Sequence, residues 1–103
     1  MTPPLPTNDT QLRECVAAAE GGCVYSQLAL GTCYFDGVMV ERDLTRAAAW
    51  YQRAADLGDA VGRVNLGGCY FFGQGVPRDV KRAVALYLQA WPSYNSHHFP
   101  GSA

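Results

Sequence analysis

The sequence contains two copies of one segment, and this internal repeat limits the folds open to the chain more than any other feature. Residues 30–54, LGTCYFDGVMVERDLTRAAAWYQRA, align with residues 66–90, LGGCYFFGQGVPRDVKRAVALYLQA, after a shift of 36 positions. The same shift pairs AAEGG at 18–22 with AADLG at 54–58. Such a period is typical of repeat proteins, in which each unit packs on its neighbours in the chain.

Each copy is predicted to be a pair of helices. In the second copy, Asp59 is a good N-cap for a helix at about 60–72, and Gly73 ends that helix. GQGVP then crosses over to a second helix, which Asp79 caps and Pro92 stops.

The first copy predicts the same pair of helices, at about 24–36 and 43–57, and residues 10–21 have the pattern of a second helix alone. The expected organisation is a disordered segment at 1–9, a repeat domain at 10–92 and a flexible tail at 93–103. Within the domain we expect a partial repeat at 10–22 and full repeats at 23–58 and 59–92.

These residues, in this order, resemble the Sel-one-like repeat family, whose unit is a helix-turn-helix close to the tetratricopeptide (TPR) class. In outline, the family pattern is LGxxYxxG, then GxGVxxD, then KAxxWYxxAAxxG. The N-terminal part of this pattern is matched by Leu66-Gly67, Tyr70, Gly73, Gly75-Val76, Asp79 and Arg82-Ala83. Its C-terminal part is matched by Trp50-Tyr51, Ala54-Ala55 and Gly58. The resemblance covers about residues 10–91. It implies an all-α fold, a short right-handed α/α solenoid of helix-turn-helix repeats (a TPR-like superhelix) with about two and a half repeats.

Two positions depart from this pattern. Met39 stands where the second copy has Gly75, and methionine would be strained if Gly75 takes a positive φ. We therefore expect the first crossover loop to follow a different path from the second. Leu88 replaces Gln52, which makes the last helix more apolar all round and suits a helix covered by a further unit or by the tail.

Composition excludes several classes of protein. The chain is 49% hydrophobic and 17% charged, as in globular domains, and its formal net charge is -1. Without a basic patch, a nucleic-acid partner is not expected. The N-terminus has no secretory pattern, and no apolar run approaches the roughly 20 residues of a membrane span. We therefore expect a cytoplasmic protein without direct membrane insertion.

The Gly-rich stretch LGGCYFFGQGVPRD does not fit a phosphate or cofactor site. A P-loop needs GxxxxGK[ST] after a strand, whereas these glycines follow an aromatic helix and no Lys-Ser/Thr pair is present. A dinucleotide site needs GxGxxG, and Gly73-Gln74-Gly75 lacks the third glycine. We therefore predict no cofactor site.

The cysteines form no metal-binding pattern, because none belongs to a CxxC pair. Cys33 and Cys69 occupy equivalent positions and are expected to be small buried side chains. Some cysteine-rich members of the family join successive units through pairs spaced like Cys15 and Cys23. Since Cys23 is out of their register, we expect no such disulfide here.

No catalytic constellation can be assembled from the remaining polar residues. His97 and His98 both lie in the tail, and Asp43 and Asp79 stand at helix starts, where N-caps are expected. We therefore predict no catalytic residue, no metal site and no enzyme activity.

A helical wheel separates a packing face from a candidate binding face. Leu66, Gly67 and Tyr70 recur unchanged in the first copy, whereas the opposite stripe differs at every pair. That stripe consists of Tyr25, Ala29, Thr32 and Asp36 in the first unit and Val61, Asn65, Gly68 and Phe72 in the second. We predict that these residues line a concave surface that binds a partner, with Phe72 and Tyr25 as aromatic anchors.

The resemblance implies a non-enzymatic interaction module, an adaptor or scaffold that holds a protein or peptide. The alternative is a structural role, as a self-associating fragment of a longer repeat array. About two and a half units is below the three or more usually needed. If the chain has this structural role, its apolar last helix, with Leu86, Leu88 and Trp91, would mediate end-to-end association.

Overall fold

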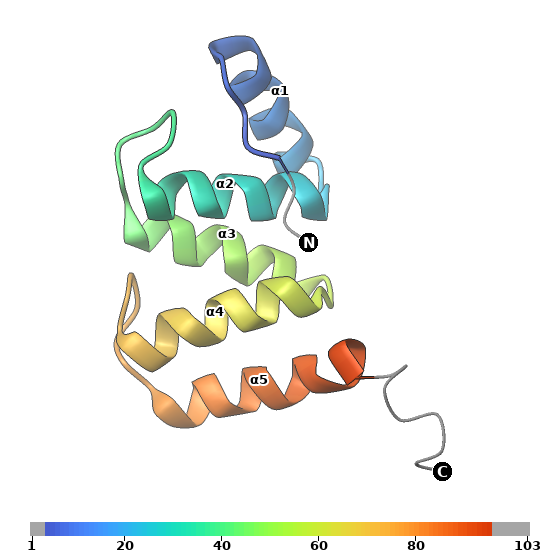
Figure 1. The fold of residues 1–103 in the computed structure, drawn as a ribbon, viewed down its shortest axis with the longest axis vertical. Coiled ribbons are helices and arrows are strands. Elements are labelled where there is room, and N and C mark those ends of the chain that lie inside the picture. Colours follow the sequence, from blue (N-terminus) through green and yellow to red (C-terminus); the bar gives the residue numbers. More distant parts are fainter. Residues whose placement is uncertain (1–3, 96–103) are drawn as a thin grey trace.

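The structure, a computed structural model, describes residues 4–95 and consists, over that range, of helices without strands. Successive helices pack on one another in chain order, which gives an elongated molecule 48 Å long (Figure 1). This is the predicted helical repeat solenoid. The helices are α1 (Asp9–Glu20), α2 (Val24–Asp36), α3 (Leu44–Asp56), α4 (Ala60–Phe72) and α5 (Val80–Asn95).

Helices α3, α4 and α5 begin close to the predicted positions because aspartate side chains cap them, whereas Cys23 at the start of α2 makes no side-chain cap. Asp59 accepts a hydrogen bond from the Gly62 amide at the start of α4, at 2.8 Å. Asp43 and Asp79 accept one from the third residue beyond, each at 3.1 Å, at the starts of α3 and α5. Each cap satisfies a backbone N–H that has no partner within its helix.

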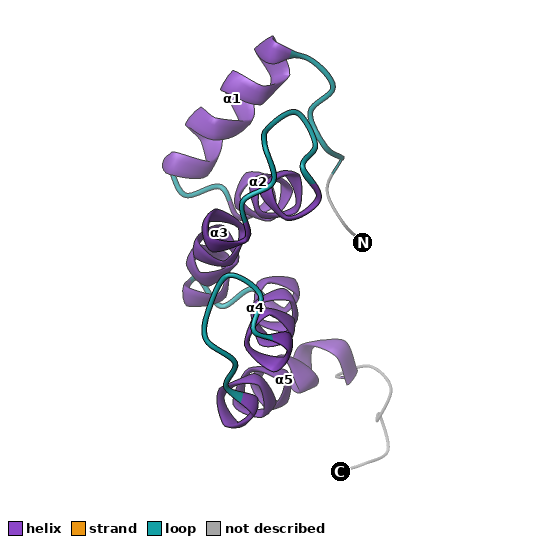
Figure 2. Cartoon of the chain, turned by 90° about the vertical axis from the view of Figure 1, so that its left-hand side faces the viewer, coloured by secondary structure: helices purple, strands orange, loops and turns teal. Residues whose placement is uncertain are grey.

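The hydrophobic core is centred on α3, which lies between α2 and α4 in the stack (Figure 2). Its small buried side chains allow both neighbours to approach closely. Gly62 of α4, for example, would place an added Cβ only 2.8 Å from the Cβ of Ala54. The core residues of α3 are Ala47, Ala48, Tyr51, Ala54 and Ala55.

The two crossover loops share one geometry, which contradicts the predicted difference between them. Met39 has φ 66° and Gly75 has φ 76°, so both take the left-handed conformation. At Gly75 an added Cβ would overlap the backbone carbonyl of Leu44, so only glycine fits. Met39 is 36% exposed and its side chain has room at the surface. The first loop therefore follows the same path with a strained residue.

The segment before α1 is ordered from Pro4 onwards, although we predict disorder over residues 1–9. Pro6 is buried, and the backbone N–H and hydroxyl of Thr7 both donate to Oε1 of Gln11, at 2.8 and 2.9 Å. Asn8 caps α1 by accepting from the Gln11 amide at 2.8 Å. These bonds hold the segment against the start of α1. Residues 1–3 lie outside the described range.

The last helix does not stop at Pro92, contrary to prediction, because α5 continues to Asn95. A proline has a helical φ, so a helix can pass through it, at the cost of one lost hydrogen bond and of crowding between its ring and the carbonyl four residues before. The predicted tail at 93–103 thus begins within α5, and residues 96–103, including His97 and His98, lie outside the described range.

Candidate binding surface

Three residues of the predicted stripe meet at an open cleft of about 310 Å³ on α4, which we call the α4 cleft. Asn65, Gly68 and Phe72 line it, and Phe72, the last residue of the helix, is 67% exposed. α4 itself also contributes Val64 and Cys69. The other helices and the following loop supply the remaining walls, which are Phe35, Tyr51, Gln74 and Tyr87.

Two tyrosines reach the α4 cleft from neighbouring helices because glycines leave them room. The Tyr51 ring covers Gly31, where an added Cβ would lie 2.5 Å from Cε1, and the Tyr87 ring covers Gly67 at 2.7 Å. The wheel does not single out these tyrosines, since it treats each helix alone. The signal that could have placed them is the glycine–tyrosine pair present in both copies.

The Tyr51 hydroxyl connects the cleft to the first unit. It shares a hydrogen bond of 3.1 Å with the Thr32 hydroxyl, so the predicted binding residue Thr32 already has an intramolecular partner. Burial raises the pKa of Tyr51 above its ordinary value, and the negative charge of Asp36 adds to this increase. Asp36 itself is exposed, in the last turn of α2.

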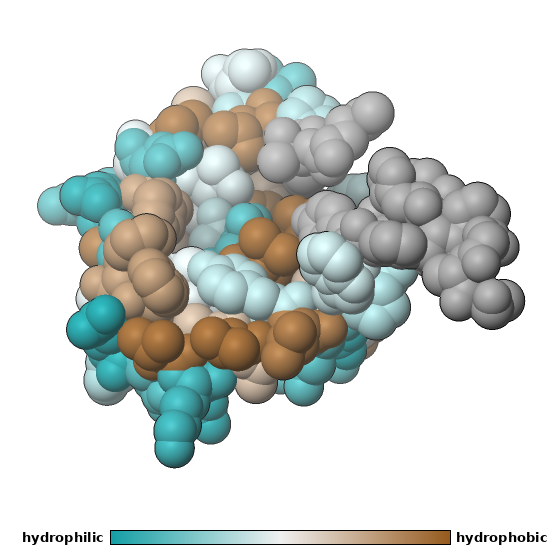
Figure 3. Space-filling model, turned by 60° about the horizontal axis from the view of Figure 1, so that its bottom comes forward, coloured by the Kyte–Doolittle hydropathy of each residue, from teal (hydrophilic) through white to brown (hydrophobic). Residues whose placement is uncertain are grey.

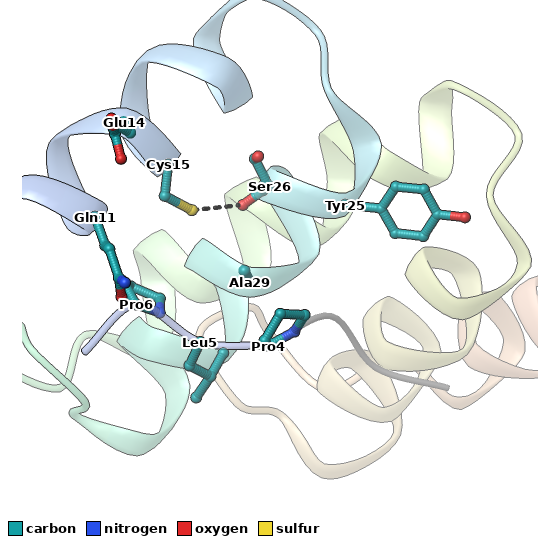
Figure 4. Close-up of a pocket in the computed structure, with 9 residues that line it drawn as sticks. All are labelled: Pro4, Leu5, Pro6, Gln11, Glu14, Cys15, Tyr25, Ser26 and Ala29. Atoms are coloured by element: carbon teal, nitrogen blue, oxygen red, sulfur yellow. Dashed lines mark hydrogen bonds between the residues drawn. The ribbon is translucent and has the colours of Figure 1, made fainter.

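Two other residues of the predicted stripe, Tyr25 and Ala29, line a separate cleft of about 450 Å³, shown in Figure 4. Tyr25 is 70% exposed at its rim, with Pro4 and Leu5 of the N-terminal segment also lining it. Ala29, predicted as a binding residue, is only 3% exposed. The reason is that α1 and the N-terminal segment lie against this part of α2.

Val61 is also misplaced by the helical wheel. It is partly buried and packs against the hydrophobic core instead of facing a partner. A wheel gives the direction of a side chain from its own helix axis, but not the position of the next helix. The structure thus brings together the C-terminal part of the predicted stripe and separates it from Tyr25, Ala29 and Val61.

The four thiols are free in the structure. Cys33 and Cys69 are buried, as predicted, and burial raises the pKa of both. Cys15 donates its S–H to the Ser26 carbonyl at 3.6 Å, and burial raises its pKa. Cys23 is exposed before α2, and a hydrogen bond with the Ser26 side chain lowers its pKa.

Over the described range, no cluster of three or more His, Cys, Asp or Glu side chains has the arrangement of a metal site. In the same range, none of the helices combines the length and apolar character that spanning a bilayer requires.

Comparison with known sequences decides the family. The sequence model of the Sel1 repeat matches residues 24–59 and 60–90, which is most of the chain. This chain belongs to the Sel1 repeat family. Proteins with Sel1 repeats generally mediate protein–protein interactions and are typically non-enzymatic scaffolds. No curated protein matches the sequence of the chain.

Solved structures of Sel1 repeat proteins have the same fold. A Sel1 repeat protein from Oxalobacter formigenes is 36% identical with a TM-score of 0.83, over 88% of this chain and 68% of that one. A protective antigen of uropathogenic Escherichia coli with this fold is 36% identical, with a TM-score of 0.80, over 84% of this chain and 19% of its own. Helicobacter pylori cysteine rich protein B is 29% identical with a TM-score of 0.78, over 84% and 65%.

Proposed function

We propose that this Sel1 repeat chain is a non-enzymatic interaction module that binds a peptide or protein segment at the α4 cleft. The observation that carries this proposal is the exposed Phe72 ring beside the aromatic walls of the cleft. Exposed aromatic side chains next to a pocket are the usual anchors of protein interfaces. Phe72 also lies edge-to-face with Phe71, at 4.9 Å between ring centroids, which limits the side-chain entropy that binding would cost.

The amides in the cleft support a peptide as the ligand. Asn65 and Gln74 line it, and neither side chain makes a hydrogen bond to another described residue. A primary amide can donate to and accept from a peptide backbone, which needs both. The cleft thus combines an apolar anchor site with hydrogen-bonding groups for a main chain.

A displayed library of random peptides, selected against the folded protein, tests the proposal. We expect selected peptides to bind Phe72→Ala at least about tenfold more weakly, the loss of one buried aromatic contact. Leu57→Ala is the matched control, since Leu57 is a similarly exposed apolar residue (58%) outside the cleft. The melting transitions of both variants should stay close to the original. Equal binding by the Phe72 variant, or no enriched peptide, would contradict the proposal.

Tyr25 tests whether the surface extends beyond the α4 cleft. If one ligand covers both clefts, Tyr25→Ala also weakens binding without changing the melting transition. A parallel loss of stability would instead assign Tyr25 to packing. Binding measurements and thermal melts on the same sample separate these outcomes.

A second candidate function is self-association through α5, favoured by the row of apolar side chains that this helix exposes (Figure 3). Val80, Val84 and Leu88 lie four residues apart on α5 and are all exposed. At the equivalent positions α3 has Leu44, Ala48 and Gln52, of which Ala48 is buried. Apolar surface of this kind is commonly covered by another helix.

Light scattering over a range of concentrations separates the two candidate functions. A monomer at all concentrations favours the interaction module alone. Growth in mass with concentration favours self-association, and Leu88→Glu should then abolish it without lowering the melting temperature.

A further inference from the structure

A short piece of the chain lies in the cleft of about 450 Å³ against α2, which we call the α2 cleft (Figure 4). Pro4, Leu5 and Pro6 form one wall of this cleft, and residues of α1 and α2, among them Tyr25 and Ala29, form the others. The open volume lies beside residues 4–6, so these residues fill only part of the groove that the two helices make. The first unit thus has an extended segment of its own chain in a groove that accepts more.

Helix capping does not account for the position of this segment. The backbone N–H and hydroxyl of Thr7 donate to Gln11 of α1, but none of residues 4–6 takes part in a hydrogen bond between described residues. Pro6 is nevertheless buried and Leu5 is half-buried. Apolar contact with the helices therefore holds this part of the segment in place.

The repeat itself does not require the segment either. The 36-residue shift pairs residues 4–6 with residues 40–42 of the first crossover loop, and none of residues 40–42 lines the α4 cleft. In the second unit the corresponding face stays open: Asn65, the counterpart of Ala29, lines the α4 cleft. The segment in the α2 cleft is therefore an addition to the first unit.

Two prolines make the segment a suitable ligand for such a groove. Proline has no backbone N–H, so it loses no hydrogen bond to water from a donor when it packs on apolar surface, and its φ is fixed before binding. Leu5, between the two prolines, supplies an apolar side chain. Tyr25 stands at the rim of the cleft, and aromatic side chains are the groups on which proline-rich segments dock.

A segment that is held by apolar contact alone can be exchanged for another. Short flexible attachment gives residues 4–6 an effective concentration on the order of 1 mM at the cleft. A longer segment of the same chemistry would also fill the open part of the groove and bury more apolar surface. Such a segment would bind more tightly and displace residues 4–6.

We propose that residues 4–6 are a built-in ligand of the α2 cleft, and that an extended segment of a partner protein, with an apolar residue between prolines, binds there in their place. The α2 cleft is separate from the α4 cleft, so this inference does not rest on the proposed function.

The peptide TPPLPTN, which has the sequence of residues 2–8, tests the proposal against a protein whose own segment is released. Leu5→Ser combined with Pro6→Ser removes the apolar contacts and leaves Thr7 and Asn8 at the start of α1. In an NMR titration, the peptide should bind this double variant with a Kd below about 0.5 mM and shift the amide signals of Tyr25 and Ala29. It should bind the original protein at least about threefold more weakly, because the chain's own segment competes at its effective concentration.

Matched controls identify the contacts. The peptide TPPSSTN carries the same two changes as the double variant and should cause no shifts. Phe72→Ala, in the α4 cleft, should leave the affinity for TPPLPTN unchanged. The double variant should melt close to the original protein, because α1 keeps its cap. A titration of the original protein needs no variant: at several times the effective concentration of about 1 mM, the peptide should move the amide signal of Leu5 to its position in an unstructured chain.

The other possible results would overturn the proposal. These are the absence of binding to the double variant, equal binding of TPPSSTN, and equal affinity for the original protein and the double variant. Shifts confined to the surroundings of Phe72 would place the peptide in the α4 cleft, which would support the proposed function and overturn this inference. A dimer of the original protein that the peptide dissociates, measured by light scattering, would assign the α2 cleft to the segment of a second copy instead of a partner.

Discussion

Met39 shows how one residue can be kept in an unfavourable conformation by the loop around it. The loop is held on both sides: the Asp43 amide donates to the Tyr34 carbonyl at 2.8 Å, and the Arg42 guanidinium donates to the Phe35 carbonyl at 3.0 Å. The second loop has the same two bonds, made by Asp79 and Arg78. These contacts determine the path of the first loop although it lacks a glycine at this position.

Replacing Met39 by glycine should therefore stabilise the protein. A left-handed conformation costs a non-glycine residue about 1–2 kcal/mol, part of which is offset by the greater freedom of glycine in the unfolded chain. We expect Met39→Gly to increase the free energy of unfolding by up to about 1 kcal/mol, measured by urea denaturation. Gly75→Ala should lower it, since an added Cβ would overlap Leu44. An unchanged or lower stability of Met39→Gly would contradict this account.

At the scale of helices, close approach depends on a few small residues facing large ones. Tyr87 of α5 lies over Gly67 of α4, and Tyr51 of α3 lies over Gly31 of α2 in the same way. The neighbouring Gly68 has space around it. Adjacent glycines in one helix therefore have different roles, one in helix packing and one at the cleft.

Alanine substitutions at these two glycines should have opposite effects. Alanine favours a helix by about 1 kcal/mol over glycine, so Gly68→Ala should stabilise the protein. Gly67→Ala should destabilise it, because its Cβ would lie 2.7 Å from the Tyr87 ring and overpacking costs about 1–3 kcal/mol. Thermal and urea unfolding of both variants check the prediction. If both substitutions stabilise the protein, α5 can move away from α4 without a cost in free energy, and the account is wrong.

At the scale of the whole molecule, stability should depend on pH through buried acidic protons. Burial raises the pKa of Cys33, Cys69 and Tyr51 in the folded protein. The unfolded chain gives up these protons at a lower pH than the folded chain does. Their contribution is therefore fully present below the unfolded pKa values and is lost as the pH rises through the folded ones.

We expect the urea midpoint to fall as the pH rises from about 8 to about 10, across the ordinary values of cysteine and tyrosine. Cys69→Ala should make this decrease smaller while lowering the midpoint at neutral pH, because it leaves a small cavity. A midpoint that is constant or rises over this range would contradict the predicted sign.

Local pattern was enough to predict the helices, because their caps and terminating glycines act within a few residues. Asp59 and Asp79 start helices where predicted, and the matched copies placed Cys33 and Cys69 in the core. Pro92 and the N-terminal segment were predicted wrongly. The end of α5 and the burial of Pro6 in the segment before α1 depend on contacts that a local sequence pattern does not contain.

Local sequence pattern predicted only part of the candidate site. Asn65, Gly68 and Phe72 lie on one face of one helix, and that face can be read from spacing alone. Tyr51 and Tyr87 enter the cleft from other helices, through gaps that depend on how those helices pack. Ala29 and Val61 are covered by neighbouring segments for the same reason.

The sequence by itself determined the repeat, the helices and the family, because these follow from a period and from short-range capping and turn preferences. Only the tertiary structure decided which side chains meet at the α4 cleft. A helix gives each side chain a direction, but the surface that remains open is set by the distance and angle of the next helix. Those depend on all the packed side chains together, small ones such as Gly67 and large ones such as Tyr87.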